Sequence, residues 1–310
     1  MAGEIISRSD SAALIPEVVA NGILQKAATQ SAALGLFRQV RMSTSQTRMP
    51  CIAALPMAYF VNGDTGQKGL SEQAWTNKFL NAEELATIVP IPEAVLDDAD
   101  FDVWGEVRPR IEEAIGRALD AAIFFGTNKP SSWPAAIFTD IAAKSHKVNR
   151  GTNAAAAGGL AGDISDAMAL IENDGYDPSG IIANRATRGR LRQNRTTLGE
   201  GQPDVTQTSA YGTAITYPMR GMWPAGSQNP ELIVGDFNEG MIGLRQDITY
   251  KVLDQAVLQN PDGSIAFNLA QQDMVALRCV FRVGFQVANV LNLDNSDENT
   301  RYPWAAVVTP

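Results

Sequence analysis

The segment Met274–Val287 keeps a strict two-residue period. Every second residue from Val275 to Val287 is apolar, whereas Arg278, Arg282 and Gln286 occupy positions between them. Because successive side chains of a β-strand point to opposite sides, this period predicts one strand with a buried face. At about 3.3 Å per residue such a strand would approach 45 Å, far beyond the usual five or six residues. We therefore expect the chain to be organised around a long sheet.

A long amphipathic helix is predicted from Phe101 to Phe125. Pro109 would bend this helix or mark its first turn, and Gly126 would end it. Apolar residues recur at steps of three and four along one stripe, which comprises Val103, Val107, Ile111, Ala114, Ile115, Ala118, Ala122 and Ile123.

Two strand-like segments, Arg48–Pro56 and Ala74–Val89, flank the Gly-rich polar stretch Val61–Ser71. This pattern predicts a long hairpin. A projecting hairpin buries little surface in a monomer, so it indicates a partner that covers it. Earlier in the chain, Pro16 opens a predicted short helix that follows an extended arm.

The middle of the chain alternates predicted helices and strands. Asp163 and Asn184 are candidate caps for helices that end at Asn173 and Asn194, and Gly175 would close the first of them. The predicted strands are Gly180–Ala183, Leu232–Val234 and Ile248–Leu253, the last leading to a turn at Asn260–Gly263. With the long strand and helix, these elements indicate an α+β protein that contains a compact α/β lobe.

Composition limits the classes of function. The 310 residues carry a formal net charge of -9, which argues against a protein whose main task is to grip phosphate backbones. The longest apolar stretches, such as Ala121–Phe125, fall far short of the roughly 20 residues of a membrane span. The first ten residues have no apolar signal core. We expect a protein made in the cytosol, without a membrane partner.

No catalytic, cofactor-binding or metal site is predicted. Cys51 and Cys279 have no metal-ligand spacing and are interpreted as small buried apolar residues. A serine hydrolase would need the single histidine, His146, as its base, but the sequence contains no GxSxG motif. His146 lies among Lys144, Ser145 and Lys147, and it is predicted at the surface.

Four other patterns have simpler interpretations than a functional site. Gly63–Lys68 (GDTGQK) lacks the Ser or Thr of a phosphate loop, and Gly235–Gly240 (GDFNEG) is interpreted as a turn. Glu112 and Glu113 are adjacent on a helix and do not form a carboxylate pair. The sequence contains one cluster of basic residues, which comprises Arg185, Arg188, Arg190, Arg192 and Arg195. An ion-pair face between subunits, or a solvated helix face, is favoured over a surface that binds nucleic acid.

The order of arm, hairpin, long helix, α/β lobe and long strand resembles the Hong Kong 97 capsid fold of tailed bacteriophages. The motifs that carry the resemblance are Leu232–Phe237 (LIVGDF), Gly243–Tyr250 (GLRQDITY) and Gln272–Phe285 (QDMVALRCVFRVGF). The resemblance implies an N-terminal arm over 1–42, an E-loop hairpin over 43–92, a P domain over 93–135 and 241–287, and an A domain over 136–240 and 288–310.

The resemblance also implies a function and partners. A major capsid protein self-assembles into hexamers and pentamers that form the icosahedral head shell around phage DNA, and it belongs to the virion after assembly in the host cytoplasm. Either a separate scaffolding protein guides assembly or none is needed, and portal and decoration proteins are the other candidate partners. Contact with packaged double-stranded DNA is expected to be weak and non-specific. No cofactor is expected.

Some members of this family crosslink their subunits through a Lys to Asn isopeptide bond that a Glu assists. Lys68 could be the donor, but the acceptor position is Asp273 and the Glu position is Val280. Valine cannot accept the proton of the lysine. We therefore predict a shell without autocatalytic crosslinks.

Two alternatives remain open at the level of sequence. An encapsulin, a bacterial shell protein of the same fold that holds cargo enzymes, would differ by a cargo-peptide pocket that sequence does not reveal. A soluble α/β enzyme is disfavoured by the single histidine, the missing motifs and the exposed hairpin.

Overall fold

The computed structural model describes residues 31–56, 73–100, 102–194, 204–218, 221–224, 229–260 and 262–310. The helix expected after Pro16, the hairpin tip with Lys68, and Arg195 lie outside these residues. The chain divides into two compact units. One includes Glu84–Gly116 and Gln246–Val283, and the other comprises Ser31–Glu83, Arg117–Arg245 and Gly284–Pro310.

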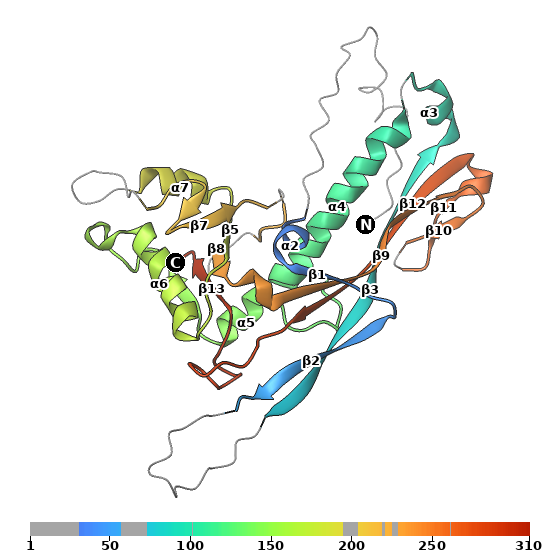
Figure 1. Ribbon diagram of the computed structural model, residues 1–310. Coiled ribbons are helices and arrows are strands. Elements are labelled where there is room, and N and C mark those ends of the chain that lie inside the picture. The colour runs from blue at the N-terminus through green and yellow to red at the C-terminus, as the bar shows by residue number, and fades with distance from the viewer. Residues whose placement is uncertain are drawn as a thin grey trace, which may run out of the picture. The chain divides into compact units, whose positions relative to one another are not determined.

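A five-stranded sheet contains the longest strands, in the order β1-β9-β12-β3-β2 (Figure 1). Strand β12 spans Met274–Val287, the bounds that the two-residue period predicts, and its predicted face is buried from Leu277 onward. Strand β9 begins at Gly240 and not at Ile248, so it is longer than expected. The strands are β1 (Arg38–Arg41), β2 (Gln46–Ala54), β3 (Ala74–Pro92), β9 (Gly240–Leu253) and β12.

Helix α4 (Val103–Phe125) confirms the predicted long helix, and it continues through Pro109. Ile111 and Ile115 are each only 4% exposed, as the stripe predicts. The prediction for Ala118 was wrong, because Ala118 is exposed and the neighbouring Leu119 is buried instead. Gly126 follows the helix with a φ of 75°, which is the left-handed conformation that commonly ends helices.

The unit that includes Glu84–Gly116 also contains helix α3 (Glu93–Asp98) and a small hairpin of β10 (Val257–Gln259) and β11 (Ile265–Asn268). The expected turn lies between these two strands. Leu258 and Phe267 pack against a buried cluster of Leu269, Met274 and Ala276. On the same hairpin Val257 is 49% exposed and Ile265 is 65% exposed.

The α/β lobe of the other unit is built on a six-stranded sheet in the order β4-β13-β8-β5-β7-β6. Its strands are β4 (Lys147–Asn149), β5 (Gly180–Ala183), β6 (Ser209–Ala210), β7 (Thr213–Thr216), β8 (Pro230–Gly235) and β13 (Trp304–Val308). Its helices are α5 (Ile137–Ala143), α6 (Leu160–Asn173) and α7 (Thr187–Gln193). Strand β13, which the sequence did not predict, pairs with both β4 and β8.

Both predicted helix caps in this lobe were wrong. Helix α6 begins at Leu160, so Asp163 lies within its first turn, and the buried Asp163 carboxylate accepts from the backbone N–H groups of Gly151 (2.7 Å) and Asn153 (2.9 Å). Helix α7 begins only at Thr187, and the Asn184 side chain accepts from the N–H of Ala186 in the preceding turn. Both side chains therefore hold loops.

Aromatic rings form the centre of the core beside the lobe sheet. The ring of Phe37 lies 5.6 Å from Phe124, 5.5 Å from Phe237 and 6.1 Å from Trp304, measured between centroids. These rings explain two glycines of the 235–240 segment. A Cβ at Gly235 would lie 2.1 Å from the Trp304 ring, and one at Gly240 would lie 2.3 Å from Phe37. The segment is a tightly packed turn, as expected.

Candidate functional site

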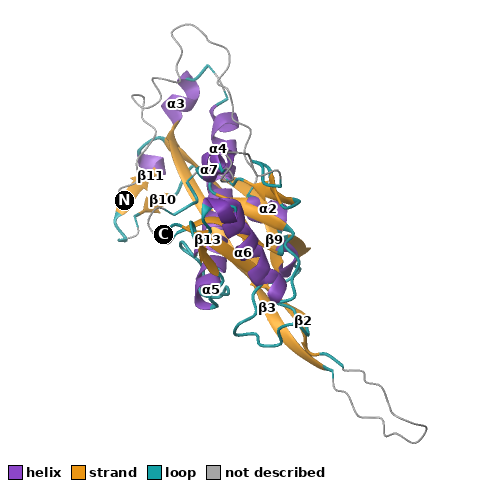
Figure 2. Ribbon diagram, turned by 90° about the vertical axis from the view of Figure 1, so that its left-hand side faces the viewer, coloured by secondary structure: helices purple, strands orange, loops and turns teal. Residues whose placement is uncertain are grey.

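The hairpin of β2 and β3 is confirmed as a two-stranded antiparallel ribbon, with Gln46 opposite Asn81 and Ile52 opposite Trp75. Figure 2 shows this ribbon without a helix on either side. Trp75 is 62% exposed and Phe79 is 45% exposed. Residues four apart on a strand share a face, so the two aromatic side chains lie on the same side of the ribbon. An apolar face of this kind marks a candidate surface for a partner.

The base of this hairpin is fixed by side chains that bind the backbone of β3. Trp133 Nε1 donates to the carbonyl of Asn81 (3.1 Å), and Gln286 Nε2 donates to the carbonyl of Phe79 (2.9 Å). Lys78 forms an ion pair with Glu298 (3.2 Å). Backbone carbonyls need hydrogen-bond partners, and here side chains from neighbouring segments supply them. These bonds therefore hold the base of the hairpin in place.

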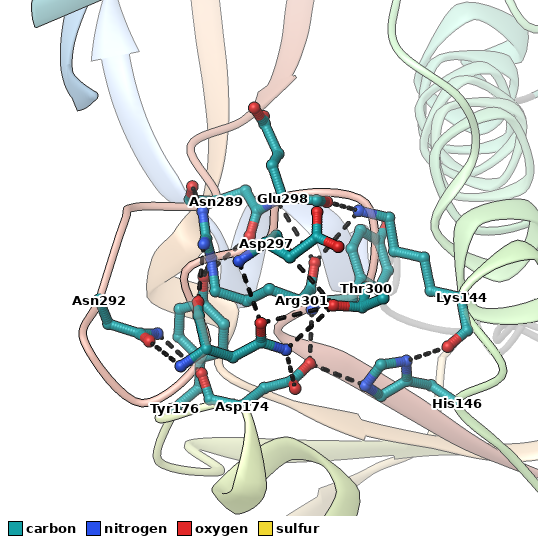
Figure 3. A network of polar contacts seen from close by, with 12 residues as sticks. Lys144, His146, Asp174, Tyr176, Asn289, Asn292, Asp297, Glu298, Thr300 and Arg301 are labelled. Atoms are coloured by element: carbon teal, nitrogen blue, oxygen red, sulfur yellow. Dashed lines mark hydrogen bonds and ion pairs between the residues drawn. The ribbon is translucent and has the colours of Figure 1, made fainter. Parts of the chain in front are cut away.

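A polar network joins the α5–β4 and α6–β5 connections to the segment that precedes β13 (Figure 3). Asp174 is its centre. Its Oδ1 accepts from Asn295 Nδ2 (2.7 Å), and its Oδ2 accepts from the backbone N–H of Tyr302 (2.8 Å) and lies 2.9 Å from Nε2 of His146. Asn292 Nδ2 donates to the Asp174 carbonyl (2.7 Å). One carboxylate thus ties three segments together.

The prediction that His146 lies at the surface was wrong. His146 is only 6% exposed, and its Nδ1 lies 2.9 Å from the carbonyl of Lys144 while its Nε2 faces Asp174. Lys144 is not a fully solvated side chain either, because its Nζ donates to the carbonyl of Arg301 (3.1 Å). Burial lowers the pKa of this lysine, and Asp140 opposes that shift.

Arg301 is the buried cation of the same network, at 2% exposure. Its guanidinium donates to Tyr176 Oη (3.0 Å) and to the carbonyls of Asn295 (2.8 Å) and Asn289 (3.2 Å). Burial raises the pKa of Tyr176, although Arg301 opposes the shift. No serine is among the residues of this network, and the arrangement serves to hold the C-terminal segment against the lobe.

Asp120 holds the other end of the described chain. Its carboxylate accepts from the Ser31 hydroxyl and from the backbone N–H groups of Ala32 (2.9 Å) and Ala33 (3.0 Å) at the start of α2 (Ala32–Leu36). Burial raises the pKa of Asp120, and these three donors oppose that shift. The part of the predicted N-terminal arm that begins at Ser31 is therefore fixed to the long helix.

Four of the predicted arginines, Arg185, Arg188, Arg190 and Arg192, are exposed on and beside α7. Arg190 and Arg150 both form ion pairs with the buried carboxylate of Glu231. The guanidinium of Arg188 stacks over the ring of Tyr217 at 4.0 Å. The sequence identified this surface, but its support by Glu231 and Tyr217 became visible only in the structure.

Other candidate chemistry is not assembled among the described residues. Within them no group of three or more His, Cys, Asp and Glu side chains could hold a metal ion. Glu112 accepts a hydrogen bond from Tyr250 (2.6 Å). Cys279 is buried as predicted and Cys51 is half-buried; both are free thiols. No helix in the described part of the chain is long and apolar enough to cross a membrane.

Comparisons with known proteins identify this architecture. The model of the family described as "Phage capsid family" matches residues 11–291. The chain belongs to the phage capsid family. The "Major capsid protein" of Staphylococcus phage 80alpha is 30% identical over 273 residues, which cover 86% of this chain and 79% of that protein. These matches confirm the resemblance to capsid proteins of tailed bacteriophages that the sequence motifs indicate.

Solved structures confirm the predicted fold. A chain of Microbacterium phage Oxtober96 matches with a TM-score of 0.82 and 35% identity, covering 99% of this chain and 100% of that one. A chain of Mycobacterium phage Bobi matches with a TM-score of 0.82 and 34% identity, covering 99% of both. The protein is a structural subunit of the phage head shell, and the shell is assembled from copies of it. It is therefore a component of the virion.

Two of the three positions considered for crosslinking in this capsid protein are described. Asp273 is exposed, has a φ of 49°, and its carbonyl accepts from the N–H of Glu93 (2.9 Å). Val280 is half-buried in β12, and its carbonyl accepts from the Thr249 hydroxyl (3.3 Å). Both act through their backbone in these contacts. Lys68, the third position, lies outside the described residues.

Proposed function

We propose that this capsid protein forms hexamers and pentamers that close into an icosahedral shell around double-stranded DNA, held by non-covalent contacts alone. The observation that carries the proposal is the hairpin of β2 and β3, whose two exposed aromatic residues need a covering surface. In a shell built from many copies of this chain, a neighbouring copy supplies that covering surface. The exposed Val257 and Ile265 offer a second apolar contact of the same kind.

The finer assignments belong to the same proposal. The arm (1–42), the hairpin (43–92), the P domain (93–135 and 241–287) and the A domain (136–240 and 288–310) are proposed divisions of labour in assembly. We propose that scaffolding, portal and decoration proteins are separate chains, and that assembly takes place in the host cytoplasm. The net charge of -9 supports only weak, non-specific contact with DNA. Catalytic, cofactor and metal sites are not proposed.

Replacing Trp75 and Phe79 together with serine should prevent assembly and leave the subunit folded. Each aromatic ring can bury 150–250 Å² at an interface, worth roughly 4–6 kcal/mol at about 25 cal/mol per Å² before the costs of association. The fraction of protein that sediments as particles measures the effect. Asn77→Ser, on the same face between the two aromatics, is the matched control and should assemble normally. Assembly of the double variant at wild-type concentrations would remove the main support for the proposal.

Mature particles should dissolve in hot detergent to a single monomer band. The physical reason is that Val280 offers no carboxylate to take the proton of an attacking lysine. Denaturing gel electrophoresis of purified particles is the measurement, with Lys68→Ala particles as the control that should look identical. A ladder of bands in the natural protein that Lys68→Ala abolishes would contradict the proposed non-covalent shell.

A further inference from the structure

Charge is segregated along two consecutive parts of the lobe. Residues 151–184 contain five carboxylates and no lysine or arginine, whereas residues 185–195 contain five arginines and no carboxylate. Helix α6 and strand β5 lie within the first part, and α7 lies within the second. Two adjacent blocks of opposite sign are unusual for a merely solvated surface, on which both signs are normally interspersed.

The basic block presents a supported surface. We call Arg185, Arg188, Arg190 and Arg192, all exposed, the basic face. Arg190 is anchored by Glu231, and Arg188 is stacked on Tyr217 at 4.0 Å, so partners within the chain hold both of these guanidinium groups. Arg185 forms no hydrogen bond or ion pair with any residue that the structure describes. Ordered arginines lose less side-chain freedom on binding, and their planar groups match carboxylates.

The acidic block presents the complementary surface. Asp163 and Asp174 are buried and hold loops, so the exposed carboxylates are Asp166, Glu172 and Asp177, which we call the acidic face. Asp166 accepts from Asn153 Nδ2 (2.7 Å). The side chains of Glu172 and Asp177 have no hydrogen bond or ion pair within the described part of the chain. Figure 1 shows α6 and α7 as separate helices of one lobe.

We infer that the basic face of one copy docks on the acidic face of the next copy in the ring. This inference rests on the proposed assembly into rings. In a ring of identical subunits each contact joins two different surfaces of the chain, so one copy must carry both complementary faces. Opposite charges then set the register, whereas contact between two basic or two acidic faces is repulsive.

A phosphate backbone is the other anion that such arginines could bind, but the observations favour a carboxylate surface. The cluster contains arginine without lysine. The ring of Tyr217 already stacks against Arg188 of the same chain, so it is not free to stack on a nucleic acid base. The carboxylates that the basic face needs are present in every copy at a fixed stoichiometry. Electrostatic attraction between such exposed faces weakens as salt rises, because the Debye length is about 8 Å at 0.15 M.

A charge-swap experiment tests the inference. Full-length protein free of DNA is prepared as wild type, Arg185→Glu with Arg188→Glu, Glu172→Lys with Asp177→Lys, and the fourfold combination. Arg185→Glu alone is compared with Lys147→Glu, which makes the same charge change on the exposed strand β4. Sedimentation measures the protein concentration at which half of each sample is in particles, at low and high salt. Circular dichroism melting of the unassembled subunits confirms that each variant is folded.

Each double variant should need at least about tenfold more protein to assemble, and the fourfold combination should return to within about threefold of wild type. Lys147→Glu should leave assembly unchanged. The inference is overturned if both double variants assemble like wild type, or if the fourfold combination assembles no better than either. It is also overturned if the arginine variant assembles normally but its particles no longer sediment with double-stranded DNA that is added afterwards, whereas wild-type particles do. Wild type in the same series tests the proposed shell function separately.

Discussion

Replacing Ile111 with Asp should abolish assembly, because the subunit should fail to fold. Ile111 is 4% exposed on the buried stripe of α4. An unpaired charge in such a position costs about 3–5 kcal/mol, a large share of the 5–15 kcal/mol that stabilises a typical domain. Thermal unfolding of the subunit and the yield of soluble protein measure the effect.

Ala118→Asp is the matched control for this prediction. It introduces the same side chain on the same helix, but Ala118 is exposed. We expect its melting temperature to stay close to that of wild type, because surface substitutions usually change stability by less than about 0.5 kcal/mol. Normal particles from Ile111→Asp, or equal losses in both variants, would show that the buried face of α4 is assigned wrongly.

The second large effect is expected for Asp174→Ala. The substitution removes the acceptor of the Tyr302 N–H and of the Asn295 amide, and it removes the partner of Nε2 of the buried His146. Buried donors without a partner cost about 1–3 kcal/mol each, and we expect a total loss of about 3–5 kcal/mol because some of them will find water. Chemical denaturation of the unassembled subunit measures this loss.

Asp177→Ala is the control for the network, since Asp177 is exposed and lies only three residues further along the chain. Its free energy of unfolding should match that of wild type. If Asp174→Ala were as stable as Asp177→Ala, the network would not hold the C-terminal segment, and another cause would be needed for its order.

Much of the fold could be predicted from sequence, because its main elements have strong periods. Strand β12, helix α4 and strand β5 lie where the patterns placed them, since each pattern records which face of an element is buried. The error at Ala118 has a simple reason. Steps of three and four drift around a helix of 3.6 residues per turn, so the choice between Ala118 and Leu119 depends on tertiary contacts.

Strand β13 could not be predicted, because Trp304–Val308 is a short apolar run without alternation and both of its faces are buried. Such runs do not distinguish strand from helix. The burial of His146 was also hidden, since its partner Asp174 lies 28 residues away and comes close only through the fold. Likewise, the arginine cluster was visible in sequence, but its anchor Glu231 belongs to a distant strand.

This chain is a shell subunit, and we propose that its own surfaces direct assembly. Expressing the protein alone and examining it by gel filtration and negative-stain electron microscopy tests this most directly. We predict capsomer rings or closed shells that form above a threshold protein concentration. A compact monomer or dimer that persists at high concentration would contradict the claim.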